Sequence, residues 1–164
     1  MITENYIKMC EQAGEIQREW KPKDGDYFYG YEWGDLAYYH RQTIIKDKNE
    51  ISEFAKKEIH LLYFTGDDYD ACFPIGENIG YDNPKPDLTK SFWLPTQEQL
   101  QEMIKDKWIC EADMLFVFKY WIEKAMVEKI ISVAKYTLTE LWLAFVMHEK
   151  YNKIWTGEKW EKEK

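Results

Sequence analysis

Three aspartates lie within four residues, at Asp67, Asp68 and Asp70, and this cluster is the first place where the sequence could support chemistry. Carboxylate oxygens are the ligands that Mg²⁺ and Ca²⁺ prefer, so closely spaced aspartates can share a divalent cation and serve a hydrolase. The EF-hand pattern is not met, because Phe73 stands where that loop needs a glycine. A solvated acidic loop explains the cluster more simply, and a metal-dependent hydrolase is kept as an alternative.

Alternating aromatic residues form a second candidate site. They occupy every other position of one short stretch, at Tyr27, Tyr29, Tyr31 and Trp33. Exposed rings on a sheet can stack on bases or nucleotides, and Arg41 is the nearest arginine that could meet a phosphate. A single-strand binder would also need a basic groove, which this segment lacks. We favour a sheet face packed under a helix, and a protein that sequesters a signalling nucleotide is the alternative.

The other reactive residue types lack the spacing that catalysis or structural zinc requires. The three cysteines and three histidines contain no CxxC or HxxxH pair, so a zinc site is not expected. No serine or cysteine lies in a nucleophile motif, and no phosphate-binding glycine loop is present. We therefore expect no catalytic residues, no metal and no cofactor. An odd, widely spaced set of cysteines is typical of reduced thiols in the cytoplasm.

Charge and composition narrow the possible partners. Of 164 residues, 22 are Lys or Arg, 30 are Asp or Glu and 17% are aromatic. The net charge of −8 argues against binding duplex nucleic acid through its phosphates, and the aromatic content argues against disorder. The longest apolar run, 141–147, is too short to cross a bilayer, and the N-terminus has no apolar signal region. We expect a cytoplasmic protein with no membrane association.

The N-terminal half is expected to supply one helix and then strands. Apolar residues recur every three or four positions over 4–20, behind Thr3 as the N-cap. Side chains then alternate with the period of a strand over 27–33, and strand-like stretches follow at 36–45 and 59–64. These segments predict an antiparallel hairpin or meander.

A long acidic loop is expected over 66–89. Glycines and prolines are frequent there, and six acidic residues against one lysine give the stretch a net charge of −5. Long loops in small domains are usually functional or mobile. We therefore add Glu77 and Asp82 to the candidate binding surface that the aspartates and the aromatic residues form.

The C-terminal half is expected to be mostly helical. Thr96 with Gln99, and Thr137 with Glu140, have the spacing of capping boxes. The helices are expected over 97–106, from Glu111 onward, and over 138–151. The segment 129–135 could continue a helix or form a strand.

Two of these helices differ in their expected burial. In the helix from Glu111, one side carries Leu115, Phe118, Ile122 and Ala125, and the other carries Lys119, Glu123, Lys124 and Glu128. The helix over 138–151 is apolar all round at LWLAFVM, so we expect it to be the central buried helix. A turn between Trp155 and Trp160 follows, and 161–164 is expected to be a frayed tail.

Together these elements predict a single α+β domain over 1–164. The expected architecture is a small antiparallel sheet from the N-terminal half, packed against a helical layer from the C-terminal half.

The segments MCEQAGEIQREWKPKDGDYFY, FWLPTQEQLQEMI and LTELWLAFVMHEKYNKIWTGEKW resemble small accessory proteins of unknown function in phages and prophages of Gram-positive bacteria. The resemblance implies a phage protein in the cytoplasm of an infected host, and it transfers no catalytic residue. Such proteins often bind host machinery. We expect a non-enzymatic inhibitor of a bacterial defence system, of the anti-CRISPR or anti-restriction type. Its acidic, aromatic surface would compete for the basic groove of a nucleic-acid-binding host enzyme.

Overall fold

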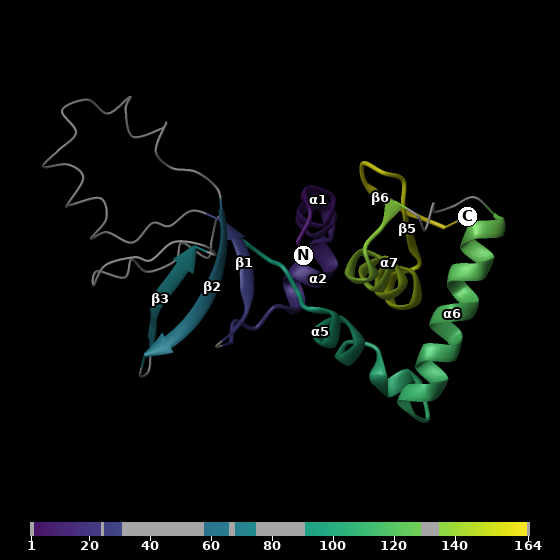
Figure 1. The fold of residues 1–164 in the computed structure, drawn as a ribbon, viewed down its shortest axis with the longest axis horizontal. Helices are drawn as coiled ribbons and strands as arrows, with labels where there is room; N and C mark the ends of the chain where they lie inside the picture. Colours follow the sequence, from purple (N-terminus) through teal and green to yellow (C-terminus); the bar gives the residue numbers. More distant parts are fainter. Residues whose placement is uncertain are drawn as a thin grey trace, which may run out of the picture. The chain divides into compact units, whose positions relative to one another are not determined.

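The computed structural model describes residues 2–23, 25–30, 58–65, 68–74, 91–128 and 135–163. Helices and small antiparallel sheets make up this part of the chain, so the predicted α+β class is confirmed (Figure 1). The chain divides into two compact units. Unit 1 comprises Met1–Glu19 and Pro95–Lys164, and unit 2 comprises Trp20–Leu94. In sequence, unit 2 is therefore an insertion within unit 1, and the single domain over 1–164 stays a prediction.

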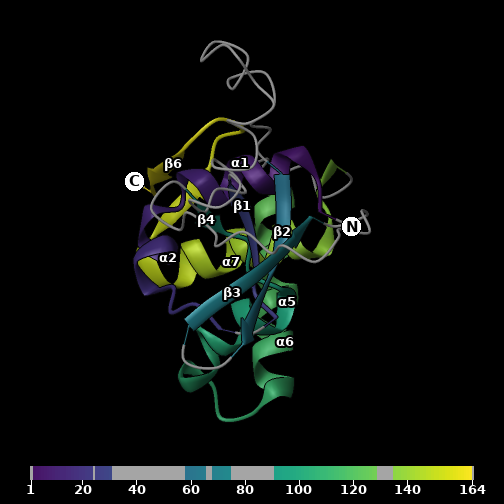
Figure 2. The same cartoon turned by 90° about the vertical axis from the view of Figure 1, so that its left-hand side faces the viewer.

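Unit 2 contains a four-stranded antiparallel sheet in the order β3-β2-β1-β4. The strands are β1 (Tyr27–Gly30), β2 (Glu58–Thr65), β3 (Asp68–Pro74) and β4 (Phe92–Trp93). Figure 2 shows β2 and β3, which pair antiparallel with Leu61 opposite Phe73. The predicted strand at 59–64 is confirmed, and the one at 27–33 is confirmed over 27–30. The predicted strand at 36–45 lies outside the described residues.

One prediction for unit 2 was wrong in part, because residues 68–74 of the expected loop form β3. Tyr69, Ala71 and Phe73 alternate with Asp68, Asp70 and Cys72, which is the period of a strand. Pairing with β2 satisfies the backbone groups that a loop would leave to water. The acidic residues obscured this alternation, because aspartate is depleted in strands. The remainder of 66–89 lies outside the described residues.

The N-terminal segment of unit 1 forms two helices, α1 (Glu4–Gln12) and α2 (Gly14–Glu19), where one helix over 4–20 was predicted. The break falls at Ala13, just before Gly14, a residue type that weakens helices. The Gln17 side chain donates a hydrogen bond to the Cys10 carbonyl at 3.0 Å, next to the break. The predicted N-cap is confirmed, because the Thr3 hydroxyl accepts a hydrogen bond from the Tyr6 amide at 3.0 Å.

The described residues of the C-terminal part of unit 1 form four helices. They are α5 (Gln97–Glu102), the 3₁₀-helix η2 (Lys105–Lys107), α6 (Glu111–Val127) and α7 (Leu138–Tyr151). Both predicted capping boxes are confirmed. The first of these helices is shorter than the predicted 97–106, because the chain leaves the α-helix after Glu102 and enters η2. The sequence left open whether 129–135 is a helix or a strand, and residues 129–134 of this segment lie outside the described residues.

Helix α7 is the buried centre of unit 1, as predicted. Every residue from Glu140 to Met147 is buried. The Trp142 ring stacks on the Phe118 ring of α6 with centroids 3.9 Å apart. Phe145 meets the Phe118 ring edge-on, with centroids 5.2 Å apart. Such aromatic pairs add about 0.5–1.5 kcal/mol each to the free energy of area burial. The α6–α7 contact is therefore the main aromatic core of this unit.

A short hairpin follows α7, which ends at Asn152 in the left-handed conformation (φ 55°). Strands β5 (Lys153–Trp155) and β6 (Trp160–Lys162) pair antiparallel, so the predicted turn between the two tryptophans is confirmed. The predicted frayed tail was wrong over 161–163. Glu161 and Lys162 belong to β6, and the Glu163 amide donates a hydrogen bond to the Asn152 carbonyl at 3.0 Å.

Candidate protein-binding surface

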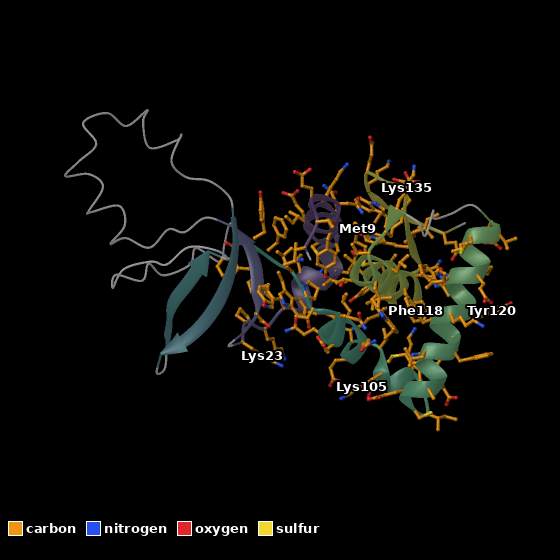
Figure 3. All side chains as sticks on the ribbon, in the orientation of Figure 1. Met9, Lys23, Lys105, Phe118, Tyr120 and Lys135 are labelled. Atoms are coloured by element: carbon orange, nitrogen blue, oxygen red, sulfur yellow. The ribbon has the colours of Figure 1, made fainter. Side chains whose placement is uncertain are left out.

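Helix α6 is apolar on two opposite sides, and only one of them is buried. The buried side is formed by Met114, Phe118, Trp121 and Ala125. Five large apolar side chains of the helix are exposed instead: Leu115 (52%), Phe116 (70%), Tyr120 (62%), Met126 (53%) and Val127 (82%). Figure 3 shows Phe118 and Tyr120 on different sides of the helix, with Phe118 on the side of α7. We call these five residues, together with Lys119 and Glu123, the α6 outer face.

The two sides arise from two interleaved patterns. The buried residues follow a 4-3-4 spacing, at 114, 118, 121 and 125, and a second 4-3-4 series runs through 116, 120, 123 and 127. The series are offset by two residues, which is slightly more than half a turn of an α-helix, so they lie on opposite sides. Both series recur every three or four residues, so the helical period alone does not show which of the two sides is buried. The rings of Trp142 and Phe145 decide which side is buried, because they stack on Phe118 and pack against Trp121.

The sequence-based assignment of this helix was therefore correct for Phe118 and Ala125 and wrong for Leu115. Leu115 was placed on the buried side and is half exposed. The error came from choosing leucine over the neighbouring Met114, one position away in the same turn. The exposed pair Phe116 and Tyr120 was missed, although its four-residue spacing is visible in the sequence.

Two charged residues lie among the exposed rings. Lys119 and Glu123 form an i,i+4 ion pair with an N–O distance of 3.4 Å, and both side chains are well exposed. Exposed pairs of this kind contribute little to stability, about 0.3–0.5 kcal/mol. The outer face thus alternates apolar groups with one positive and one negative charge.

Single exposed apolar residues are common on protein surfaces, whereas a contiguous group of them marks an interaction site. Phe, Tyr and Met are also the residue types enriched where proteins meet. Ile109, two positions before α6 begins, is a further exposed apolar residue (97%). A surface of this composition is suited to contact with another protein.

The binding surface predicted from the sequence lies mostly outside the described residues, at Tyr31, Trp33, Arg41, Asp67, Glu77 and Asp82. Tyr27 and Tyr29 lie in β1 and are half-buried. Asp68 and Asp70 lie in β3, and β2 runs between that strand and β1. The described part of the sheet thus places the tyrosines and the aspartates on strands that are not adjacent.

Part of the aromatic content of unit 2 forms a core. Trp20 stacks on Trp93 with centroids 6.4 Å apart and lies 6.5 Å from the ring of Phe28, which is fully buried. The Trp20 indole N–H donates to the carboxylate of buried Asp26 at 2.8 Å, and the Lys23 amide donates to the same oxygen. Phe28 alternates with Tyr27 and Tyr29 along β1, so this core lies on the opposite face of the strand, and the packed-face interpretation of the tyrosines stays a prediction.

A buried carboxylate joins the two sequence segments of unit 1. Glu140 accepts hydrogen bonds from the Thr3 hydroxyl at 2.6 Å and the Asn5 amide at 2.9 Å, and from the backbone N–H of Thr137. Burial raises the pKa of this carboxyl, but the hydrogen bonds outweigh that effect and hold its pKa below the usual range. Each bond satisfies a polar group, so we assign Glu140 a structural role.

Two further titratable groups of unit 1, His148 and Cys10, are also engaged in structure. His148 lies between two carboxylates, with Nδ1 3.0 Å from Glu149 and Nε2 3.0 Å from Glu163. Burial raises the pKa of the Cys10 thiol, which makes it unreactive. Within the described ranges, no group of three or more His, Cys, Asp or Glu residues could hold a metal ion. No helix in this part of the chain is long and apolar enough to cross a membrane.

Comparisons with known proteins add no relative. No protein-family model matches the chain. No curated protein matches it, and neither does any solved structure. The α6 outer face is therefore identified from its own exposure and composition.

Proposed function

We propose that this protein is a non-enzymatic binding protein and that the α6 outer face is its docking surface for another protein. The observation that carries the proposal is the exposure of Phe116, Tyr120 and Val127 on one side of a helix whose other side is packed in the core. Their spacing of four and seven residues is that of a helix that inserts its apolar anchors into a partner.

The resemblance to phage accessory proteins suggests that the partner is a host protein of a bacterial defence system. The net charge of −8 supports a partner with a basic surface, since complementary charge steers association and selects partners. This finer proposal predicts that capture of the partner weakens as salt is raised, because screening reduces attraction between exposed charges.

The test is a pull-down from a lysate of a Gram-positive bacterium with three forms of the full chain. They are the wild type, the double variant Phe116→Asp/Tyr120→Asp, and the control Leu138→Asp. Leu138 is 54% exposed at the start of α7, so the control removes a comparable apolar side chain elsewhere. We expect the wild type and the control to recover the same protein and the double variant to lose it.

Equal recovery by all three forms would contradict the proposed surface. Identification of the captured protein by mass spectrometry tests the finer proposal separately. A nuclease or another defence component supports it, and a protein without such a role contradicts it while leaving the docking surface in place.

A further inference from the structure

We infer that, in the free protein, the α6 outer face binds the α6 outer face of a second copy of this chain, with the two helices antiparallel. The inference rests on the proposed function, because it uses the same surface, and it goes further by naming one occupant. It is carried by the order of residues along the helix, in which apolar and charged positions are arranged symmetrically.

The apolar residues of the outer face form two pairs at equal distances from position 121. Leu115 and Phe116 precede it by six and five positions, and Met126 and Val127 follow it by five and six. All four are more than half exposed. A two-fold axis that crosses the outer face at the height of position 121 would therefore place the first pair of one copy against the second pair of the other. Such an isologous interface is the commonest way in which identical chains associate.

The charged residues have the same symmetry with opposite signs. Lys119 precedes position 121 by two residues and Glu123 follows it by two. The antiparallel arrangement brings each Lys119 opposite the Glu123 of the second copy. A parallel arrangement would bring Lys119 opposite Lys119 and Glu123 opposite Glu123, and like charges in contact are unfavourable. The charges therefore select the antiparallel orientation.

Tyr120 is one position from 121 along the helix and lies at one edge of the outer face, where it is 62% exposed. Its ring would meet the same residue of the second copy at that edge of the contact. A contact made by one helix from each copy is small for a protein interface, so the association should be weak, with a dissociation constant on the order of micromolar.

Sedimentation equilibrium of the full chain tests the association. We expect the mass to rise from the 19.9 kDa of one chain towards twice that value as the concentration increases through the micromolar range. Tyr120→Asp should raise the dissociation constant at least roughly tenfold, because it places two negative charges near each other across the two-fold axis. Leu138→Asp, outside the outer face, should leave it unchanged. A wild type that stays monomeric at hundreds of micromolar would overturn the inference.

A charge-exchange experiment tests the pairing of Lys119 with Glu123. Lys119→Glu gives an outer face with two negative charges, and Glu123→Lys gives one with two positive charges. Each variant alone should associate more weakly than the wild type, and an equimolar mixture should form mixed dimers. Circular dichroism controls for loss of helix, since like charges at i,i+4 destabilise a helix slightly. A mixture that associates no better than the separate variants would contradict this pairing.

Cysteine cross-linking tests the orientation in a Cys110→Ser background, which removes the exposed native thiol beside α6. Leu115→Cys mixed with Met126→Cys should form a disulfide-linked dimer under mild oxidation. Leu115→Cys alone should remain largely uncoupled. The reverse result would indicate parallel helices and overturn the antiparallel arrangement.

The inference and the proposed function fail in distinguishable ways. A monomeric wild type that still loses its captured protein through Phe116→Asp/Tyr120→Asp overturns only the self-association. A dimer with the expected cross-link, in a chain whose captured protein is unaffected by the same substitutions, supports the self-association and contradicts α6 as the docking surface for another protein.

Discussion

Helices α6 and α7 are both rich in apolar residues, yet these residues have different surroundings. In α7, the continuous run from Glu140 to Met147 is buried. In α6, the side bearing Phe118 and Trp121 packs against α7, while the opposite side bearing Phe116 and Tyr120 is exposed. Packing within the fold accounts for the apolar run 141–147 of α7. In α6 it accounts for the four buried residues, and the five exposed apolar residues are those that a partner would cover.

The largest expected effect on stability comes from a substitution in α7, at its contact with α6. Trp142→Ala removes a ring that is 1% exposed and lies 3.9 Å from Phe118. We expect the free energy of unfolding to fall by about 3–5 kcal/mol, because a large cavity remains. Chemical denaturation followed by helical circular dichroism measures it. A loss below about 1 kcal/mol would show that α7 is not the centre of the unit.

A somewhat smaller loss is expected for Glu140→Ala. The substitution leaves the Thr3 hydroxyl and the Asn5 amide without their acceptor and removes half of a capping box. Unpaired buried donors cost about 1–3 kcal/mol. Glu140→Gln keeps the shape and one acceptor oxygen, so denaturation should show a smaller loss for it. Equal stability of Glu140→Ala and wild type would contradict the structural role assigned to Glu140.

The same carboxylate predicts a pH dependence. The pKa of Glu140 is lowered in the folded state, so the unfolded state binds the proton more readily. Its contribution is fully present above the ordinary glutamate pKa of about 4.3 and is lost as the pH falls through the lower folded value. Thermal unfolding from pH 6 to pH 3 should therefore show a smaller loss of stability in Glu140→Gln than in the wild type. Parallel curves for the two proteins would contradict this assignment.

The smallest effect on stability is expected for the outer face. Phe116→Ser changes a ring that is 70% exposed, so the free energy of unfolding should stay within about 0.5 kcal/mol of the wild type. The same denaturation measurement as for Trp142→Ala makes the comparison direct. A loss above about 2 kcal/mol would mean that this ring is part of the core. It would then contradict the distinction between an exposed side of α6 and the buried run of α7.

Local signals in the sequence predicted much of unit 1. Thr96 and Thr137 were identified as caps because a capping hydrogen bond depends on residues only three positions apart. The buried run in α7 was identified because no polar residue interrupts it. The register of α6 could not be predicted in the same way, since two apolar series fit its period and only packing against Trp142 chooses between them.

The less predictable features depend on contacts between distant residues. Strand β3 needs β2 as a partner, and its aspartates favoured a loop in the sequence. Glu163 is held next to His148, fifteen positions earlier, so the end of the hairpin could not be recognised from local composition. The exposed side of α6 was missed for a different reason. Sequence patterns were interpreted as core first, and only the exposed fractions of Phe116 and Tyr120 separate a core ring from a surface ring.

Unit 1 is divided between two distant stretches of the chain, and this division determines when the unit can fold during synthesis. Thr3 and Asn5 form their hydrogen bonds with Glu140, more than 130 residues later. A ribosome makes the N-terminal segment first, so α1 must leave it with Tyr6, Met9 and Cys10 lacking the helix that later buries them. All of the inserted unit is translated before α7 appears. Nascent α1 is therefore exposed to chaperones and proteases until translation of the segment after Pro95 is nearly complete, and unit 1 closes late, after a long loop has been formed.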